Sequence, residues 1–379
     1  MTLSNSPALN QIEVSLFGPG FGESLVIHLG GGDWIIVDSC DAENRDYPAP
    51  LLYLEALGVN LANSVKLVVA THWHDDHVRG MSNVYRVCKN ARFAFPAALT
   101  GKEFVKLIEL YKGQGGQSPS GVDEFSYILY DLAKCKRNGV SRFKRAAADT
   151  RLLTNKVNLG NAQLIASVDA LSPSDEAVMA GQMAFANLFE GSKKRSRRLP
   201  AAEPNRTSVA LWVRVGEHRL LLGADLETAK GNPKTGWTVI LDQSQVIDGK
   251  ASVFKVPHHG SQNAHDTRVW EELLTTEAVA ILTPFWKGDV KLPSNTDEKR
   301  IIGMGRDAYI TASNVQKDPD IKDRVVRDTV AEATRSIRRL HPQAGHVRLR
   351  SNLHAPFAWK VELFGGARAL TSKDDSEPQ

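Results

Sequence analysis

The sequence has few cysteines and no long apolar run, and both shortages restrict what the protein can be. Its three cysteines, Cys40, Cys88 and Cys135, lie too far apart in sequence to form a CxxC zinc site, and so few do not make a disulfide framework. Such sparse use is typical of a reducing compartment. No apolar run approaches the roughly 20 residues that cross a bilayer, and the first residues lack the charged-then-apolar pattern of a secretion signal. We therefore expect a soluble, cytoplasmic protein without a membrane partner.

A strong excess of charge of one sign is also missing. The chain has 47 lysines and arginines against 43 acids, and the formal net charge of +4 does not by itself indicate a nucleic-acid partner. The densest charge run is the basic loop 191–198, GSKKRSRR. A solvated loop is the simpler interpretation of this run, and a patch that follows the phosphates of a substrate is the alternative.

Apolar residues are plentiful, at 42% of the chain, and many fall into short runs that are typical of strands. Two such runs, 24–29 and 34–37, are separated by the triple glycine 30–32, which predicts a hairpin. From about residue 100 to 140 the apolar spacing becomes helical, and strand-like runs return after it. Two sheets packed face to face with helices outside is one of the few layered solutions for this order of elements.

The length permits two domains, since domains have roughly 100–200 residues. We predict instead one domain over 1–370, with a helical insert at about 100–140 and the basic loop 191–198. The polar residues 371–379 form a predicted disordered tail. His218 lies at a predicted hairpin turn and is expected to face solvent.

The strongest local signal is the segment THWHDDH at 71–77, directly after an apolar run. Neutral imidazole and carboxylate suit zinc, manganese or iron. His72 and His74 can point the same way only if the backbone there is extended, whereas Asp76 and His77 follow a turn and can face a second ion. Two ions bridged by water would provide a nucleophile at neutral pH. A chance surface cluster is the alternative, and the scarcity of histidine, 11 in 379 residues, disfavours it.

Two downstream segments carry further candidate ligands. Asp225 follows the apolar run 219–222, where it could bridge two metals or, taken alone, cap a helix that starts at Leu226. The pair His258–His259 follows another apolar run and precedes Gly-Ser. A strand end is a rigid support for ligands, so both segments are plausible parts of one site.

Together these motifs resemble the metallo-β-lactamase superfamily. The series His72-x-His74-x-Asp76-His77 is similar to its HxHxDH signature, Asp38 to its first-motif aspartate and Asp225 to its bridging aspartate. A narrower resemblance, to domains like the ComEC/Rec2 DNA-uptake protein, rests on GFGES at 20–24, LSP at 171–173, NRTSV at 205–209 and KVPHHGS at 255–261. Phosphorylcholine esterases share the last arrangement.

The resemblance implies an α/β fold, a four-layer αββα sandwich with a helical insertion and two divalent ions, zinc or manganese, between the sheets. The implied ligands are His72 and His74 for one ion, Asp76, His77 and His259 for the other, and Asp225 between them, with Asp38 supporting the ligands from behind. His258 would face the substrate together with Ser261, or the two adjacent histidines exchange roles.

The sequence departs from this family in two places. No histidine occurs from Val78 to Glu217, so the third-motif histidine is absent, and Asn205 or a water molecule would take its position. Leu292-Pro293-Ser294 stands where related sequences have His-Pro-Ser.

The function expected from these residues is that of a metal-dependent hydrolase with Asp76 and His258 as catalytic residues. The narrower resemblance favours a phosphodiesterase or nuclease-like enzyme, with a phosphodiester or nucleic-acid substrate. Hydrolysis of a lactone, thioester or other ester on the same fold is one alternative, because fold does not fix substrate. A degenerate-site subunit is another, and the helical insert or the C-terminal region would then bind a partner protein.

Overall fold

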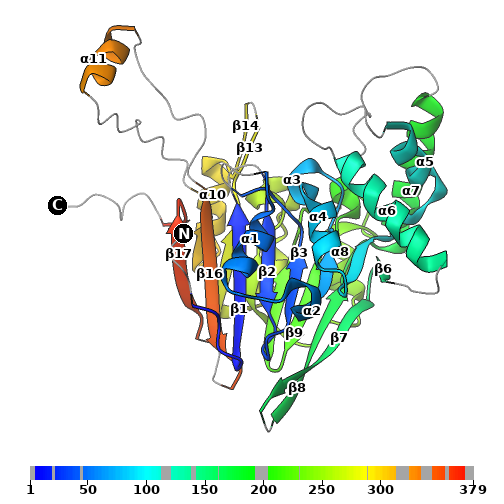
Figure 1. Ribbon diagram of the computed structural model, residues 1–379, viewed down its shortest axis with the longest axis horizontal. Coiled ribbons are helices and arrows are strands. Elements are labelled where there is room, and N and C mark those ends of the chain that lie inside the picture. Colours follow the sequence, from blue (N-terminus) through cyan, green and yellow to red (C-terminus); the bar gives the residue numbers. More distant parts are fainter. Residues whose placement is uncertain are drawn as a thin grey trace.

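The computed structural model describes residues 5–18, 22–42, 46–111, 121–137, 142–160, 162–192, 204–229, 231–287, 289–312, 324–333, 344–354 and 358–371. Within them the chain forms two large mixed sheets and a small hairpin (Figure 1). Sheet 1 has the order β17 (Lys360–Gly365), β16 (Gly345–Asn352), β1 (Gln11–Gly18), β2 (Ser24–His28), β3 (Trp34–Val37), β4 (Val65–Val69), β5 (Arg92–Pro96) and β6 (Phe143–Ala146). Sheet 2 has the order β18 (Arg368–Ala369), β15 (Ala308–Ile310), β12 (Leu274–Leu282), β11 (Ala251–Lys255), β10 (His218–Leu222), β9 (Leu211–Val215), β8 (Ala162–Ala170) and β7 (Thr150–Leu159). The hairpin consists of β13 (Phe285–Lys287) and β14 (Val290–Leu292).

Helices pack against the outer face of each sheet. Their bounds are α1 (Ala49–Ala56), α2 (Leu61–Ser64), α3 (Asp75–Val78), α4 (Met81–Val87), α5 (Lys102–Tyr111), α6 (Gly121–Arg137), α7 (Asp175–Ser192), α8 (Gly236–Gln243), α9 (Thr267–Glu272), α10 (Asn295–Gly303) and α11 (Arg324–Ala333). Short 3-10 turns occur at Ala97–Thr100, Pro204–Thr207, His258–Gly260 and Gln262–Ala264. No helix among the described residues combines the length and the apolar character that crossing a bilayer requires.

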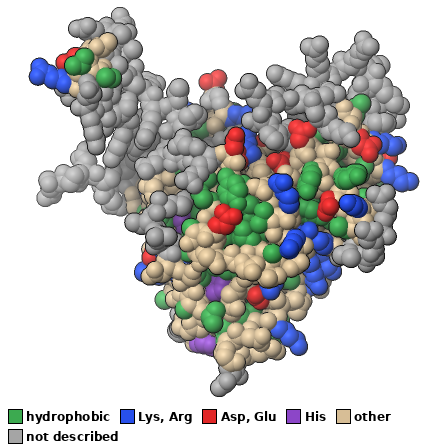
Figure 2. Space-filling view, viewed as in Figure 1, with side chains coloured by type: hydrophobic (Ala, Val, Ile, Leu, Met, Phe, Trp, Pro, Cys, Tyr) green, Lys and Arg blue, Asp and Glu red, His purple; other side chains and the backbone are tan. Residues whose placement is uncertain are grey.

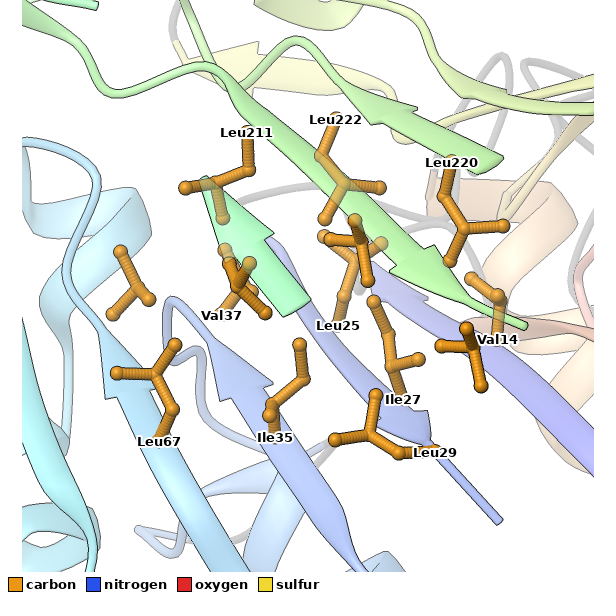
Figure 3. Packing of buried hydrophobic residues seen from close by; sticks show 14 of the residues in the cluster. Val14, Leu25, Ile27, Leu29, Ile35, Val37, Leu67, Leu211, Leu220 and Leu222 are labelled. Atoms are coloured by element: carbon orange, nitrogen blue, oxygen red, sulfur yellow. The ribbon is translucent and has the colours of Figure 1, made fainter. Parts of the chain in front are cut away.

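Three apolar cores separate the layers. The central core lies between the sheets, where Val14, Leu25 and Ile35 of sheet 1 face Leu211 and Leu220 of sheet 2 (Figure 3). A second core joins sheet 1 to α1, α4, α5 and α6, and a third joins sheet 2 to α8, α9 and α10. Helix, sheet, sheet and helix therefore follow one another, which confirms the predicted four-layer αββα fold with a helical insertion.

The sequence pattern predicted some elements correctly and missed others. The 24–29 and 34–37 runs form the antiparallel pair β2–β3, and Gly30, Gly31 and Gly32 between them all have positive φ, at 91°, 62° and 86°. The predicted helical segment holds α5 and α6, which pack together and beside α7 at one side of the molecule (Figure 1). Helix α7 itself was not predicted. Residues 193–198 of the predicted basic loop and 372–379 of the predicted tail lie outside the described residues.

The expectation that His218 faces solvent is wrong. His218 is the first residue of β10 and is 1% exposed. Its Nε2 lies 3.0 Å from the carbonyl oxygen of Asn352, and its ring lies against Trp359 at 5.2 Å. The turn is at Gly216, just before β10 begins, and the C-terminal strands of sheet 1 then cover the histidine.

A second buried histidine, His346 in β16, predicts a measurable pH dependence of stability. Its ring is stacked between Phe17 and Phe364, at 4.4 Å and 5.1 Å, and burial together with Arg348 and Arg350 lowers its pKa from 6.5 to about 3. Between these two values the unfolded chain binds a proton that the folded chain does not, so acidification from pH 6.5 towards 3 lowers the free energy of unfolding by about 1.4 kcal/mol per pH unit from this residue.

The His346→Gln variant should lose this contribution. Urea unfolding at pH 4.5, 5.5 and 6.5 should then show a shallower loss of stability on acidification than in the wild type. His354→Gln changes an exposed histidine of the following turn and should leave the slope unaltered. Equal slopes in wild type and His346→Gln would show that His346 is not the titrating group.

Candidate metal centre

The carboxyl ends of parallel strands in both sheets meet at one place, and polar side chains gather there. Strands β3, β4, β5 and β6 are parallel in sheet 1, and β10, β11, β12 and β15 are parallel in sheet 2. The sequence-predicted residues that follow directly are Asp38 after β3, His72 to His77 after β4, Asp225 after β10, and His258 and His259 after β11. The two sheets therefore deliver side chains that are remote in sequence to one edge.

One group consists of His72, His74 and Asp225. The Nε2 atom of His72 lies 3.2 Å from Nδ1 of His74 and 3.9 Å from Oδ2 of Asp225. These ligand atoms all lie within 4.8 Å of one another, so one ion could contact all three. Burial lowers the pKa of both histidines, which keeps the imidazoles neutral and leaves a lone pair for a metal.

A second group consists of His77, His259, Asp76 and the same Asp225. Oδ1 of Asp225 lies 3.3 Å from Nε2 of His77, and Oδ2 lies 3.7 Å from Nε2 of His259. The Asp76 carboxylate lies 3.5 Å from His259 Nε2 and 3.8 Å from His77 Nε2. Asp225 thus stands between two groups of candidate ligands, with one carboxylate available to both.

The candidate ligand atoms of this second group are suited to binding a metal ion. Nε2 of His77, Nε2 of His259 and Oδ1 of Asp225 are buried and have no hydrogen-bond partner among the described residues. Leaving three such atoms unpaired in one place is costly unless something else satisfies them. Two imidazole nitrogens and carboxylate oxygens suit zinc or manganese, so the residues fit a divalent cation.

The electrostatics of the group point the same way. Burial raises the pKa of Asp225, but His77 and His259 outweigh this and hold it well below its usual range. Burial lowers the pKa of His77, yet the surrounding carboxylates, Asp225 first, raise it well above its ordinary value. The pocket therefore favours positive charge at its centre, and a proton on His77 or a divalent cation can supply it.

Asp38 orients histidines of both groups. Its Oδ2 lies 2.7 Å from Nδ1 of His77 and accepts a 2.7 Å hydrogen bond from the Thr71 hydroxyl. Because that hydroxyl proton is directed to Asp38, Thr71 Oγ1 can accept from Nδ1 of His72 at 3.1 Å. Both imidazoles then carry their proton on Nδ1 and present Nε2 to the centre. Asp38 lies in the position that the sequence predicted for a supporting residue.

Glu23 and Thr283 support His259 in a similar way, and neither was given a role from the sequence. Thr283 Oγ1 donates to Glu23 Oε2 at 2.6 Å and lies 3.0 Å from His259 Nδ1. The Lys255 ammonium lies 2.5 Å from Glu23 Oε1, donates to the Ala224 carbonyl and is 3.9 Å from Asp225. Lys255 and Glu23 are both fully buried, and both lie in motifs that carried the family resemblance, so only those motifs offered a signal for them.

Asp38 is the common support, and its amide variant should weaken metal binding. Asp38→Asn keeps the shape but removes the charge, and its amide cannot serve as acceptor for the Thr71 N–H, the Thr71 hydroxyl and His77 Nδ1 at once. Loss of such a supporting hydrogen bond typically lowers metal affinity about 10–100-fold, which is the effect we expect here. Competition with a chromophoric zinc chelator measures it, and Asp33→Asn, which removes a partly exposed carboxylate beside Lys66, is the control. Unchanged zinc affinity in Asp38→Asn would contradict the role.

His258 is held at the edge of the centre rather than in it. Its Nδ1 lies 3.0 Å from Oδ1 of Asn263 and its Nε2 lies 3.2 Å from Nδ2 of Asn205, which matches a neutral ring with the proton on Nδ1. Both amides also donate to Oε1 of Glu227. Asn205 therefore lies beside His258, and its replacement of the absent third-motif histidine stays a prediction.

Backbone strain is concentrated at this edge of the molecule. Five non-glycine residues of the described chain have positive φ, and four of them are Asp38 (59°), Ala224 (44°), His258 (47°) and His259 (53°). Each conformation costs about 1–3 kcal/mol and persists only where the surroundings enforce it. The turns that carry the candidate ligands are thus held in unfavourable conformations by the contacts described above.

Two sequence interpretations need revision here. No helix begins at Leu226, since residues 223–229 are turn and irregular structure, so the alternative role of Asp225 as a helix cap is wrong. Ser261 lies outside the residues that line the cleft at the centre and instead borders a separate small hollow beside Arg300. A substrate contact for Ser261 therefore stays a prediction.

The helical insert forms hydrogen bonds with the segment 71–77, the metal motif, and with the residues just after it. Asp75 Oδ1 accepts a 2.7 Å hydrogen bond from the backbone N–H of Gly121, the first residue of α6, and Glu124 of α6 accepts from the N–H groups of Gly80 and Ser82. A Cβ on Gly121 would lie 2.5 Å from the Trp73 carbonyl oxygen, so only glycine permits this approach. The start of α6 consequently forms one wall of the cleft above the centre.

The cleft itself has a volume of about 390 Å³. It is lined by Trp73, His74, Asp75, Asp76, Gly121, Val122, Asn205, Asp225, His258, His259, Phe285, Lys287, Val290 and Leu292. On the face seen in Figure 2, both Lys or Arg and Asp or Glu side chains occur, and hydrophobic side chains gather near the middle. The cleft has the size of a small-molecule site.

One family model and several solved structures are similar to this chain. The family model of the metallo-beta-lactamase superfamily matches residues 17–104, which include Asp38 and the motif 72–77. No curated protein matches the chain. Among solved structures, the metallo-beta-lactamase fold protein YhfI from Bacillus subtilis is 11% identical, with 72% of this chain and 85% of that chain covered and a TM-score of 0.35. BJP-1, a subclass B3 metallo-beta-lactamase of Bradyrhizobium japonicum, is 15% identical, with 62% and 70% covered and a TM-score of 0.25.

Proposed function

We propose that this protein is a metal-dependent hydrolase that acts on phosphodiesters. The observation that carries the hydrolase proposal is the convergence of His77 Nε2, His259 Nε2 and Asp225 Oδ1, which are buried and have no hydrogen-bond partner among the described residues, beside His72 and His74. This group lies at the bottom of an open cleft, where a substrate can reach it.

The chain's own residues then have distinct tasks. His72 and His74 would hold one ion, Asp76, His77 and His259 the other, and Asp225 both. Zinc or manganese, when bound, would polarise a substrate oxygen and lower the pKa of water at the site. Asp38, Thr71, Glu23 and Thr283 fix which nitrogen of His72, His77 and His259 faces the centre.

His258 is the candidate proton donor. It lines the cleft next to Asp225, its side chain is 17% exposed, and Glu227 lies 3.6 Å from its Nδ1. In its protonated form the ring could donate from Nε2 to a leaving oxygen. Asn205 contacts Nε2 in this structure and would have to release it.

The choice of a phosphodiester rests on the sequence. The segments at 205–209 and 255–261 resemble those of ComEC/Rec2-like domains and, in the second case, of phosphorylcholine esterases. His258 and Asn205 of these segments line the cleft, so the resemblance concerns the walls of the site as well as its metal ligands.

The test combines metal analysis with a substrate panel. Purified protein should contain zinc or manganese and should hydrolyse bis(p-nitrophenyl) phosphate faster than p-nitrophenyl acetate, a lactone or a β-lactam. Asp76→Ala should lose this activity with the fold intact by circular dichroism, whereas His354→Ala, an exposed histidine far along the chain, should retain it.

The other outcomes each support a different function. Preference for the ester or lactone would indicate the alternative chemistry on the same fold. Absence of bound metal, with no gain of activity on addition of zinc or manganese, would favour a degenerate site and a role as a subunit. Metal-dependent phosphodiesterase activity retained in Asp76→Ala would rule out this centre as its source.

A further inference from the structure

Among the residues that the structure describes, the walls of the cleft contain no candidate metal ligands. The floor of the cleft consists of the candidate ligands and His258, whereas the walls are largely apolar. The apolar lining residues are Trp73 of the metal motif, Val122 of α6, and Phe285, Val290 and Leu292 of the β13–β14 hairpin. The hairpin rises above the edge of the sheets near α10 (Figure 1).

The hairpin turns one of its two faces to the cleft. Phe285 pairs with Leu292 and Lys287 pairs with Val290, and these four residues line the cleft. Trp286 and Lys291, the pair between them, do not line it. This alternation is what a period of two along each strand produces. Among the described strands β13 and β14 pair only with each other, and so short a hairpin is marginal alone.

The apolar wall begins directly at the metal-binding groups. The Phe285 ring lies 5.3 Å from the His259 ring, tilted by 32°. Further from His259, Val290 is 52% exposed. This is a large exposure for an apolar residue that lines a cleft. Leu292, the cross-strand partner of Phe285, is half-buried. A ligand bound at the candidate metal ligands could therefore also cover the apolar surface that begins at Phe285.

The described residues of the wall offer few cations to a polyanion. Lys287 is the single lysine or arginine among the described residues that line the cleft. Proteins that follow a nucleic-acid backbone neutralise successive phosphates with several cations, and aromatic stacking surfaces usually accompany them. The lining here provides a short apolar surface of a size suited to one small ligand.

We propose that the β13–β14 face, together with Val122 and Trp73, is a subsite for an alkyl or aryl group of the substrate. The substrate class is then a small phosphodiester in which one substituent is apolar, with its phosphate at the metal-binding groups and that substituent along Phe285, Val290 and Leu292. This inference rests on the proposed function, because that function places the phosphate.

Binding of n-alkyl phosphates to the zinc-loaded protein tests the subsite without relying on turnover. Isothermal titration calorimetry would compare inorganic phosphate with methyl, propyl and pentyl phosphate. Burial of each methylene on a partly open wall should tighten binding about two- to fourfold, so pentyl phosphate should bind at least about tenfold tighter than methyl phosphate.

Variants of the hairpin provide matched controls. Leu292→Asn and Val290→Asn change the face that lines the cleft and should reduce the gain from methyl to pentyl phosphate to less than about twofold, with the affinity for inorganic phosphate unaltered. Lys291→Asn changes the opposite face of the same strand and should keep the full chain-length dependence. Circular dichroism and zinc content show that all three variants remain folded and loaded.

The outcomes separate this inference from the proposed function. If phosphate binds but chain length has no effect, the subsite is overturned and the hydrolase proposal stands. A chain-length effect without any phosphodiester hydrolysis would support the subsite and overturn the phosphodiesterase. If none of these phosphates binds, both are overturned, and tighter binding of a short single-stranded oligonucleotide than of pentyl phosphate would also overturn the subsite.

Discussion

Replacement of Asp225 by asparagine should abolish metal binding at both groups and lower phosphodiester hydrolysis by about a thousandfold or more. Bound metal contributes several kcal/mol to transition-state stabilisation, and each 1.36 kcal/mol corresponds to a factor of about ten in rate. The Asp225 carboxylate lies within 3.9 Å of His72, His77 and His259. Since one oxygen faces His77 and the other faces His72 and His259, an amide can satisfy only part of the centre.

Elemental analysis after dialysis and kcat/KM on bis(p-nitrophenyl) phosphate together measure this prediction. Asp242→Asn is the matched control, because it removes an exposed aspartate that pairs with Arg268 on the surface. Asp76→Ala should spare metal at the His72 group and lose it at the His77 group, so the two variants differ in residual zinc. Two equivalents of zinc retained by Asp225→Asn would contradict the bridging position.

The candidate ligands were predictable from sequence because each lies directly after an apolar strand. Asp38 follows β3, His72 follows β4, and the His258–His259 pair follows β11, so local pattern and motif together located them. The arrangement of two sheets could also be inferred, since strand-rich halves flank a helical segment. What lies at a strand end is local information, and the sequence carries it.

The contacts that support the candidate ligands were not predictable, because they join residues that are far apart in sequence. Thr283 and Glu23 are 260 positions apart, and no local pattern indicates that a hydroxyl just after β12 of sheet 2 will meet a carboxylate next to sheet 1. The β13–β14 hairpin was missed because strands of three residues are too short to show alternation above chance. His218 was misplaced because Asn352 and Trp359, far along the chain, contact its ring. In each case the missing information is tertiary.

The buried pair of Lys255 and Glu23 gives the largest expected effect on stability. Lys255 of β11 and Glu23 before β2 are both 0% exposed, and their ion pair spans the two sheets. Loss of one partner from a buried pair leaves an uncompensated charge and costs about 3–5 kcal/mol. Lys255→Met should therefore lower the free energy of unfolding by about that amount, measured by urea denaturation with a chelator present so that metal binding does not contribute.

The double variant decides whether the cost comes from the charge or from packing. Glu23→Gln in the Lys255→Met background removes the stranded carboxylate, and the amide oxygen that replaces it can still accept from the Thr283 hydroxyl, so it should recover much of the lost stability. Arg268→Met, which breaks an exposed pair with Glu272, should cost less than about 1 kcal/mol. If Lys255→Met were as mild as this surface control, the two sheets would not depend on the pair. A loss of about 3–5 kcal/mol in Lys255→Met that Glu23→Gln restores would show that the cost comes from the unpaired charge of Glu23. The Lys255 ammonium would then also hold β11, and with it His258 and His259, against the segment 71–77.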